Sequence, residues 1–136
     1  MTTTRTSAPP KQTVTAYDLL GGEAGLRKLV EAFYRTMVVS PEVAGIRAMH
    51  GSDLGPITEM LYEWLSGWLG GPPLYVQRKG GPCLVGSHQP YAIGEAERDQ
   101  WLWCMARALD ELNIEPRLRS GIDPVFARLA DMVRNR

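Results

Sequence analysis

Apolar residues recur with helical spacing in four segments of the chain. In residues 22–38 they fall at i, i+3, i+4, i+7 and i+11, a spacing typical of the buried stripe of an amphipathic helix. Residues 53–69, 94–112 and 116–134 repeat the pattern. The stripes are Leu26, Leu29, Val30, Phe33 and Met37; Ile57, Met60, Leu61, Trp64, Leu65 and Trp68; Trp101, Cys104, Met105, Ala108 and Leu112; and Ile122, Val125, Phe126, Leu129 and Val133. The pattern predicts an all-α domain.

The segment between the second and third predicted helices, residues 70–94, is rich in Gly and Pro. An irregular connection of this length inside a small domain is uncommon and is often functional. Within it, residues 83–88 have room for one or two helical turns before Pro90 prevents continuation. A histidine on such a turn, His88, could face a cavity and bind a ligand. Histidines in loops are more often solvated or capping residues, so this signal alone is weak.

The first fifteen residues differ from the rest of the chain. They are rich in Thr and Pro and contain few large apolar side chains. Such a segment buries too little surface to offset the entropy of ordering it. We predict a flexible tail over 1–15, for which a transit peptide is a minor alternative, and one domain over 16–136.

Composition narrows the classes of function. Lys and Arg total 15 and Asp and Glu total 15, so the formal net charge is zero, which argues against nucleic acid as a partner. The scattered charges and the lack of a long apolar run argue against a membrane partner. The two cysteines form no CxxC motif, and with only two histidines a structural zinc site is not expected. We expect reduced thiols in a cytoplasmic protein.

Five sequence strings stand out by their order and spacing: YDLLGG at 17–22, FY at 33–34, WLGGPPLY at 68–75, HQPYAI at 88–93 and RDQWLWCM at 98–105. Taken together, they resemble the group II truncated hemoglobins of the two-over-two globin family. The similarity covers roughly residues 17–135. It implies four helices that sandwich heme b, whose ferrous iron binds dioxygen and other diatomic ligands such as carbon monoxide and nitric oxide.

The resemblance places the proximal iron ligand at His88, in the HQPYAI string. Ferrous heme needs a neutral imidazole whose other nitrogen is hydrogen-bonded. The carbonyl of Leu84, one turn earlier, is the expected acceptor. A Cys83 thiolate is the alternative ligand, but we expect that side chain to pack as a small hydrophobe. Tyr91, in the same string, is a further expected heme contact.

On the opposite face of the heme, the family steadies the oxygen ligand with polar side chains. The matching residues are Tyr34 and Trp101, both capable of donating a hydrogen bond. A third distal group falls at Met49 or His50, and we select His50 because it alone can hydrogen-bond. Whether His50 donates to the ligand or binds iron as a sixth ligand when no gas is present stays open.

The remaining predicted heme contacts are less specific. Ile57 and Leu61 occupy distal positions that face the ligand, and Trp64 would cover the heme edge; ordinary core packing is the alternative for Leu61 and Trp64. The family commonly carries arginines that reach the heme propionates where this chain has Val85 and Ser87. Propionate anchors are therefore expected elsewhere, at Tyr75, Arg78 and Lys79.

These observations predict reversible binding of dioxygen, serving either transport or redox chemistry on the bound gas. Enzymatic turnover as a nitric oxide dioxygenase or a peroxidase stays open, and would require a reductase partner. The alternatives are a heme-based sensor or partner-binding module without turnover, and a heme-free helical interaction domain. The sequence does not distinguish a monomer from a homodimer.

Overall fold

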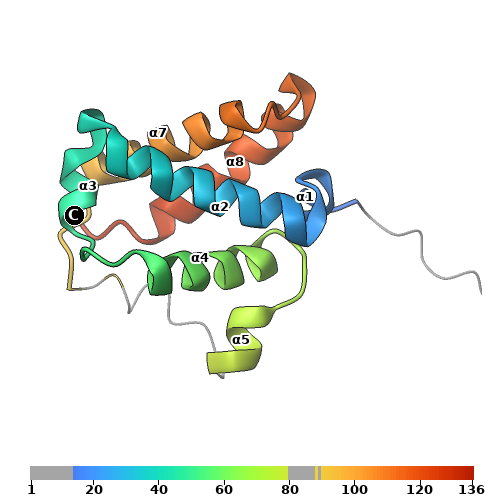
Figure 1. Ribbon diagram of the computed structural model, residues 1–136, viewed down its shortest axis with the longest axis horizontal. Helices are drawn as coiled ribbons and strands as arrows, with labels where there is room; N and C mark the ends of the chain where they lie inside the picture. The colour runs from blue at the N-terminus through green and yellow to red at the C-terminus, as the bar shows by residue number, and fades with distance from the viewer. Residues whose placement is uncertain (1–13, 80–87, 89) are drawn as a thin grey trace, which may run out of the picture.

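The computed structural model describes residues 14–79, 88 and 90–136, and these residues form helices with no strand among them (Figure 1). The predicted tail, except for its last two residues, lies outside this range. The elements are α1 (Ala16–Leu19), α2 (Gly22–Val39), the 3₁₀ helix η1 (Pro41–Val43), α3 (Ala44–Ala48), α4 (Gly55–Trp68), α5 (Leu74–Lys79), α7 (Glu95–Glu111) and α8 (Pro116–Met132).

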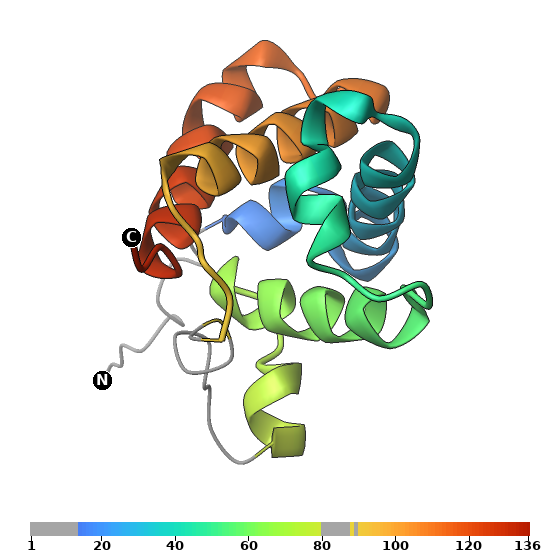
Figure 2. The same cartoon turned by 90° about the vertical axis from the view of Figure 1, so that its left-hand side faces the viewer.

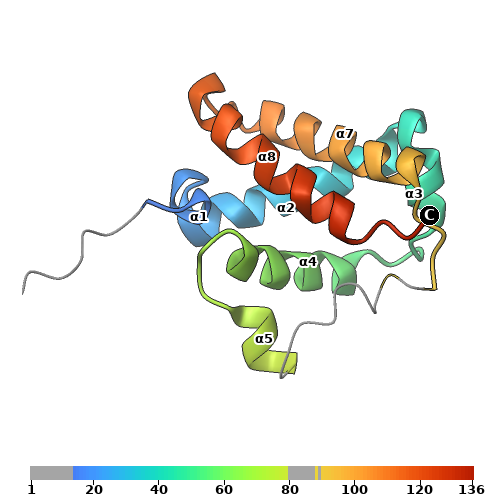
Figure 3. The same ribbon diagram turned by 180° about the vertical axis from the view of Figure 1, so that it is seen from behind.

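The four long helices confirm the segments predicted from apolar periodicity, and each end lies within two residues of its prediction. Helix α2 packs against both α4 and α7, and α7 packs against α8. Figures 1 and 3 show the pair α7 and α8 on one side of α2 and helix α4 on the other. The pairs α2/α4 and α7/α8 thus form the predicted two-over-two sandwich.

The core lies where the stripes of these helices meet. Phe33, Met37, Leu65, Met105 and Phe126 are all at most 1% exposed. Burial of an apolar side chain of this size contributes roughly 1.5–3 kcal/mol to folding. Among the described residues, no helix is both long enough and apolar enough to cross a membrane.

Helix α1 is short and is fixed by hydrogen bonds at its start. Thr15 begins it with a capping box: the Thr15 hydroxyl accepts a hydrogen bond from the Asp18 amide at 3.1 Å, and the Asp18 carboxylate accepts one from the Thr15 amide at 3.2 Å. The Tyr17 amide donates to the Leu69 carbonyl at 2.9 Å, which ties α1 to the end of α4.

The connection that leaves α4 passes very close to α1. A Cβ atom on Gly71 would lie 2.4 Å from the Tyr17 ring, and one on Gly70 would lie 2.8 Å from the Thr15 side chain. Gly70 also has a φ of +97°, which favours glycine. The two glycines therefore permit this contact.

The long connection after α4 is less irregular than its composition predicts, because it contains α5. Pro72 and Pro73 precede this helix, and their carbonyls accept hydrogen bonds from the Leu74 and Gln77 amides. Proline is compatible with a helix start, where its missing N–H is not needed. Figures 1, 2 and 3 all show α5 beyond α4, on the side away from α7 and α8.

Candidate functional site

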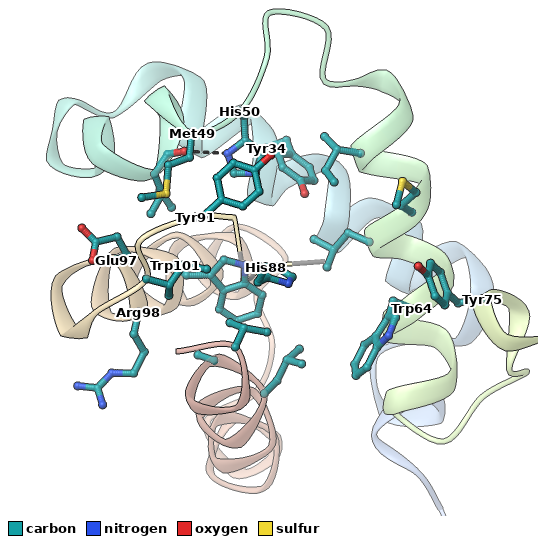
Figure 4. Close-up of a pocket in the computed structure, with 18 residues that line it drawn as sticks. Tyr34, Met49, His50, Trp64, Tyr75, His88, Tyr91, Glu97, Arg98 and Trp101 are labelled. Carbon is teal, nitrogen blue, oxygen red and sulfur yellow. Dashed lines mark hydrogen bonds between the residues drawn. The ribbon is translucent and has the colours of Figure 1, made fainter. Parts of the chain in front are cut away.

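A cavity of about 370 Å³ lies between the helices, and apolar and aromatic side chains form most of its wall (Figure 4). Predicted site residues from distant parts of the chain meet there: Tyr34, His50, Ile57, Leu61, Trp64, Tyr75, His88, Tyr91 and Trp101. Residues that line it without having been assigned to the site are Ile46, Met49, Met60, Ile93, Glu97, Arg98, Leu129, Ala130 and Val133. Met60, Leu129 and Val133 belong to the predicted stripes, so periodicity marked them as core rather than as cavity wall.

His88 reaches the cavity from the segment between α5 and α7 and is half-buried. Figure 4 shows it between a group formed by Tyr34, Met49 and His50 and the pair Trp64 and Tyr75. Its backbone carbonyl accepts a hydrogen bond from the Tyr91 amide at 3.0 Å. The main chain around His88 is therefore closed into a turn.

Several predicted positions fall outside what the structure describes. These are the expected acceptor Leu84, the alternative ligand Cys83, the substituted positions Val85 and Ser87, and the side chains of Arg78 and Lys79. Their roles stay predictions.

Tyr34, on α2, is 6% exposed and contributes a hydroxyl to the cavity wall. Its ring packs edge-on against Phe33, with ring centroids 5.0 Å apart, and against His50 at 5.9 Å. Burial raises the pKa of the Tyr34 hydroxyl above its ordinary value, so the group keeps its proton. Within the described residues this hydroxyl has no hydrogen-bond partner. The proton is therefore available to a ligand in the cavity.

Trp101, on α7, supplies a second donor. Its ring lies between Phe33 and Phe126, with centroid distances of 5.3 and 6.0 Å, and these contacts fix the plane of the indole. The indole nitrogen can only donate. No acceptor for it is found in the described part of the chain.

The sequence analysis left Met49 and His50 as alternatives for the third distal position, and both residues line the cavity. The Nδ1 atom of His50 lies 2.7 Å from the Ile46 carbonyl oxygen. A carbonyl only accepts hydrogen bonds, so Nδ1 carries the proton, and in a neutral ring Nε2 then carries a lone pair. The expected role of His50 as a donor to the ligand through Nε2 therefore requires a charged imidazolium.

Helix α7 holds the short helix that carries this acceptor. The Gln100 side-chain oxygen accepts a hydrogen bond from the Ile46 amide at 3.0 Å, which satisfies one of the free amides in the first turn of α3. A Cβ on Gly45 would lie 2.8 Å from the same oxygen. Gly45 thus leaves room for Gln100, and Gln100 positions the carbonyl that orients His50.

The charged residues at the cavity rim are engaged with the protein. The Arg98 guanidinium pairs with Asp131 and Asp99, each at 3.0 Å, and it points away from the cavity (Figure 4). The Glu97 carboxylate accepts a hydrogen bond from the Gly94 amide at 2.8 Å. The Arg98 side chain therefore forms ion pairs with Asp99 and Asp131 and does not extend into the cavity, where it could bind a heme propionate.

The chemistry of the lining fits a flat apolar group that brings its own metal. No cluster of three or more His, Cys, Asp or Glu side chains that could hold a bare metal ion occurs in the residues described. The cavity offers an imidazole at His88, an apolar wall from α4 and α8, and two donors, Tyr34 and Trp101, for which the described residues supply no acceptor. A porphyrin supplies the four equatorial ligands that the protein lacks, and an imidazole is a common axial ligand of its iron.

The sequence matches the model of the bacterial-like globin family over residues 15–135. It is 34% identical over 113 residues to the group 2 truncated hemoglobin YjbI of Bacillus subtilis, an alignment that covers 83% of this chain and 80% of that protein. The chain belongs to the group II truncated hemoglobins.

Solved structures of truncated hemoglobins share this fold. The group II 2-on-2 hemoglobin from Agrobacterium tumefaciens superposes with a TM-score of 0.84 at 42% identity, over 93% of this chain and 98% of that one. The cold-adapted truncated hemoglobin from Pseudoalteromonas haloplanktis also gives a TM-score of 0.84, at 39% identity over 90% and 98% of the two chains. Heme is accordingly the cofactor of this truncated hemoglobin, and it binds ligands such as oxygen.

The His50 tautomer gives a first testable result for this truncated hemoglobin. Because Nε2 of the neutral ring carries a lone pair and cannot donate, His50→Ala is expected to change oxygen release by less than the roughly tenfold that loss of a charge-assisted hydrogen bond causes. Stopped-flow measurement of oxygen dissociation checks this. A tenfold acceleration would show that Nε2 carries a proton after all. Conversion of a low-spin ferric spectrum to high spin in the same variant would show that Nε2 binds the iron.

Proposed function

We propose that this truncated hemoglobin retains oxygen and uses it to oxidise nitric oxide to nitrate, rather than delivering oxygen to tissue or to another protein. The observation that carries the proposal is the pair of donors, Tyr34 and Trp101, which line the cavity and have no hydrogen-bond partner among the residues that the structure describes. Bound heme supplies ferrous iron that binds diatomic gases. His88 would hold that iron from the segment between α5 and α7.

The two donors decide how long a gas stays. Oxygen acquires negative charge when it binds to ferrous iron, and a hydrogen bond to a charged partner contributes roughly 1.5–3 kcal/mol. Each donor would therefore slow release by about ten- to a hundredfold. A carrier must release its cargo, whereas a reaction that consumes the gas in place loses nothing from slow release. Slow release therefore favours turnover over transport.

The apolar wall would keep the reaction dry. Ile57 and Leu61 lie on the stretch of α4 that faces the cavity, and neither can donate a proton or bind iron. Trp64 packs against Trp68, with ring centroids 5.1 Å apart, and closes the end of this wall near Tyr75. Exclusion of water would protect the bound gas from protonation and loss.

The experiment mixes the oxygenated ferrous protein with nitric oxide in a stopped-flow instrument and measures nitrate afterwards. One nitric oxide and one dioxygen give one nitrate when one electron is supplied, here by the ferrous protein. We expect one nitrate per heme, formed faster than oxygen dissociates. Reaction no faster than oxygen release would contradict the proposal and favour a carrier or a sensor. A parallel assay with hydrogen peroxide and a reducing dye tests peroxidase turnover.

A further inference from the structure

The C-terminal residues of the chain fold back onto the segment that carries His88. Asn135 follows α8 by three positions and lies beside His88, Tyr91 and Ile93. Its side-chain oxygen accepts a hydrogen bond from the Ile93 amide at 2.9 Å. Its side-chain nitrogen donates to the Tyr91 carbonyl at 2.9 Å and to the His88 carbonyl at 3.2 Å. Both amide protons and the amide oxygen thus bind one short segment.

The main chain adds to this contact. The Asn135 and Arg136 amides both donate to the Ile93 carbonyl, at 2.8 and 3.1 Å. Ile93 is 8% exposed and lines the cavity. The C-terminus therefore holds the segment at its end nearest α7 through the backbone and at its His88 end through one side chain.

Few other backbone hydrogen bonds are found among the described residues of this segment. Pro90 has no N–H to donate, and the Tyr91 amide donates to the His88 carbonyl. The His88 carbonyl thus accepts from Tyr91 within the segment and from Asn135 across the fold. An imidazole that binds iron must be held in a defined orientation. The position of the His88 backbone sets where that ring can point.

We propose that Asn135 is a positioning residue for the proximal ligand, acting through the His88 and Tyr91 carbonyls. Asparagine suits this role because its amide combines two donors with an acceptor. Aspartate keeps the acceptor for Ile93 and loses both donors, and alanine loses all three. The inference rests on His88 binding the heme iron, and that assignment has its own test in a His88 variant.

The experiment compares Asn135→Asp and Asn135→Ala in the heme-loaded protein. The first readout is the iron–histidine stretching band of the ferrous, gas-free form in resonance Raman spectra. The second is the rate of hemin transfer to an excess of apomyoglobin. We expect both variants to shift or broaden the band and to release hemin about three- to tenfold faster, as loss of one or two neutral hydrogen bonds implies. Arg128→Ala, on an exposed part of α8, is the matched control and should change neither readout.

The two variants separate positioning from stability. Asn135→Asp retains the bond to Ile93, and circular dichroism of each variant without heme reports whether the fold persists. An unchanged stretching band in both folded variants would overturn the proposal, even if their unfolding midpoints fell. If the band is absent from the unaltered protein or survives His88→Ala, then the assignment of His88 has failed rather than the role of Asn135.

Discussion

Replacing His88 by alanine is expected to abolish the Soret absorption of the purified protein or to reduce it to a trace. Two described histidines line the cavity. His88 lies on the segment between α5 and α7, and His50 lies just after α3. Loss of a group that merely orients a metal ligand costs roughly 10–100-fold in affinity. Loss of the ligand itself should cost more, because porphyrin then binds through apolar contacts alone.

The control for this variant is chemical rescue. In His88→Gly the space of the side chain is empty, and free imidazole added to the buffer is expected to restore the Soret band and a five-coordinate ferrous spectrum. His50→Ala should keep its heme throughout. Retention of heme with an unchanged iron–histidine band in His88→Ala would refute the assignment, and His50, the other histidine of the sequence, would then be tested next.

Removing the distal donors should have the second largest effect. Tyr34→Phe and Trp101→Phe are each expected to speed oxygen dissociation by about ten- to a hundredfold, because each removes one hydrogen bond to a negatively charged ligand. Both changes keep an aromatic ring, so packing on Phe33 is retained. Burial raises the pKa of Tyr34, so its donor should persist in alkaline buffer beyond the range where an exposed tyrosine ionises.

The unfolding midpoint of the apoprotein is the control for these variants. The Tyr34 hydroxyl has no hydrogen-bond partner among the described residues, so Tyr34→Phe removes no hydrogen bond that the structure describes and should leave the unfolding midpoint of the apoprotein unchanged or slightly higher. A change in oxygen release below about twofold in both variants would show that the two donors do not reach the gas. The double variant measures whether they act on the same ligand.

The sequence predicted the long helices because each buries a continuous stripe of apolar side chains. In a helix longer than about three turns, such a stripe can be recognised from the spacing of apolar residues in the sequence. It did not predict α5 (Leu74–Lys79), η1 (Pro41–Val43) or α3 (Ala44–Ala48). These elements are too short to show an apolar period. Their positions depend on prolines and on contacts with distant residues such as Gln100.

The sequence predicted many of the residues that line the site, but not how their side chains are oriented by hydrogen bonds. Resemblance brought Tyr34 and Trp101 together, and the cavity contains both. The tautomer of His50 was not predictable, because it depends on where the Ile46 carbonyl points. The orientation of Arg98 could not be predicted either, because the direction of its guanidinium depends on Asp131, thirty-three positions later in the sequence. Hydrogen bonds between residues far apart in the sequence produce no recognisable pattern in the neighbouring residues.

The glycine at position 71 has a consequence for how relatives of this protein are identified. Its missing side chain makes room for the Tyr17 ring, and neither residue lines the cavity. The two glycines of the Gly-Gly-Pro-Pro string therefore reflect how α1 packs against the end of α4. A descendant that had lost its porphyrin could preserve that string unaltered, so its presence identifies shared ancestry and architecture rather than respiration or detoxification.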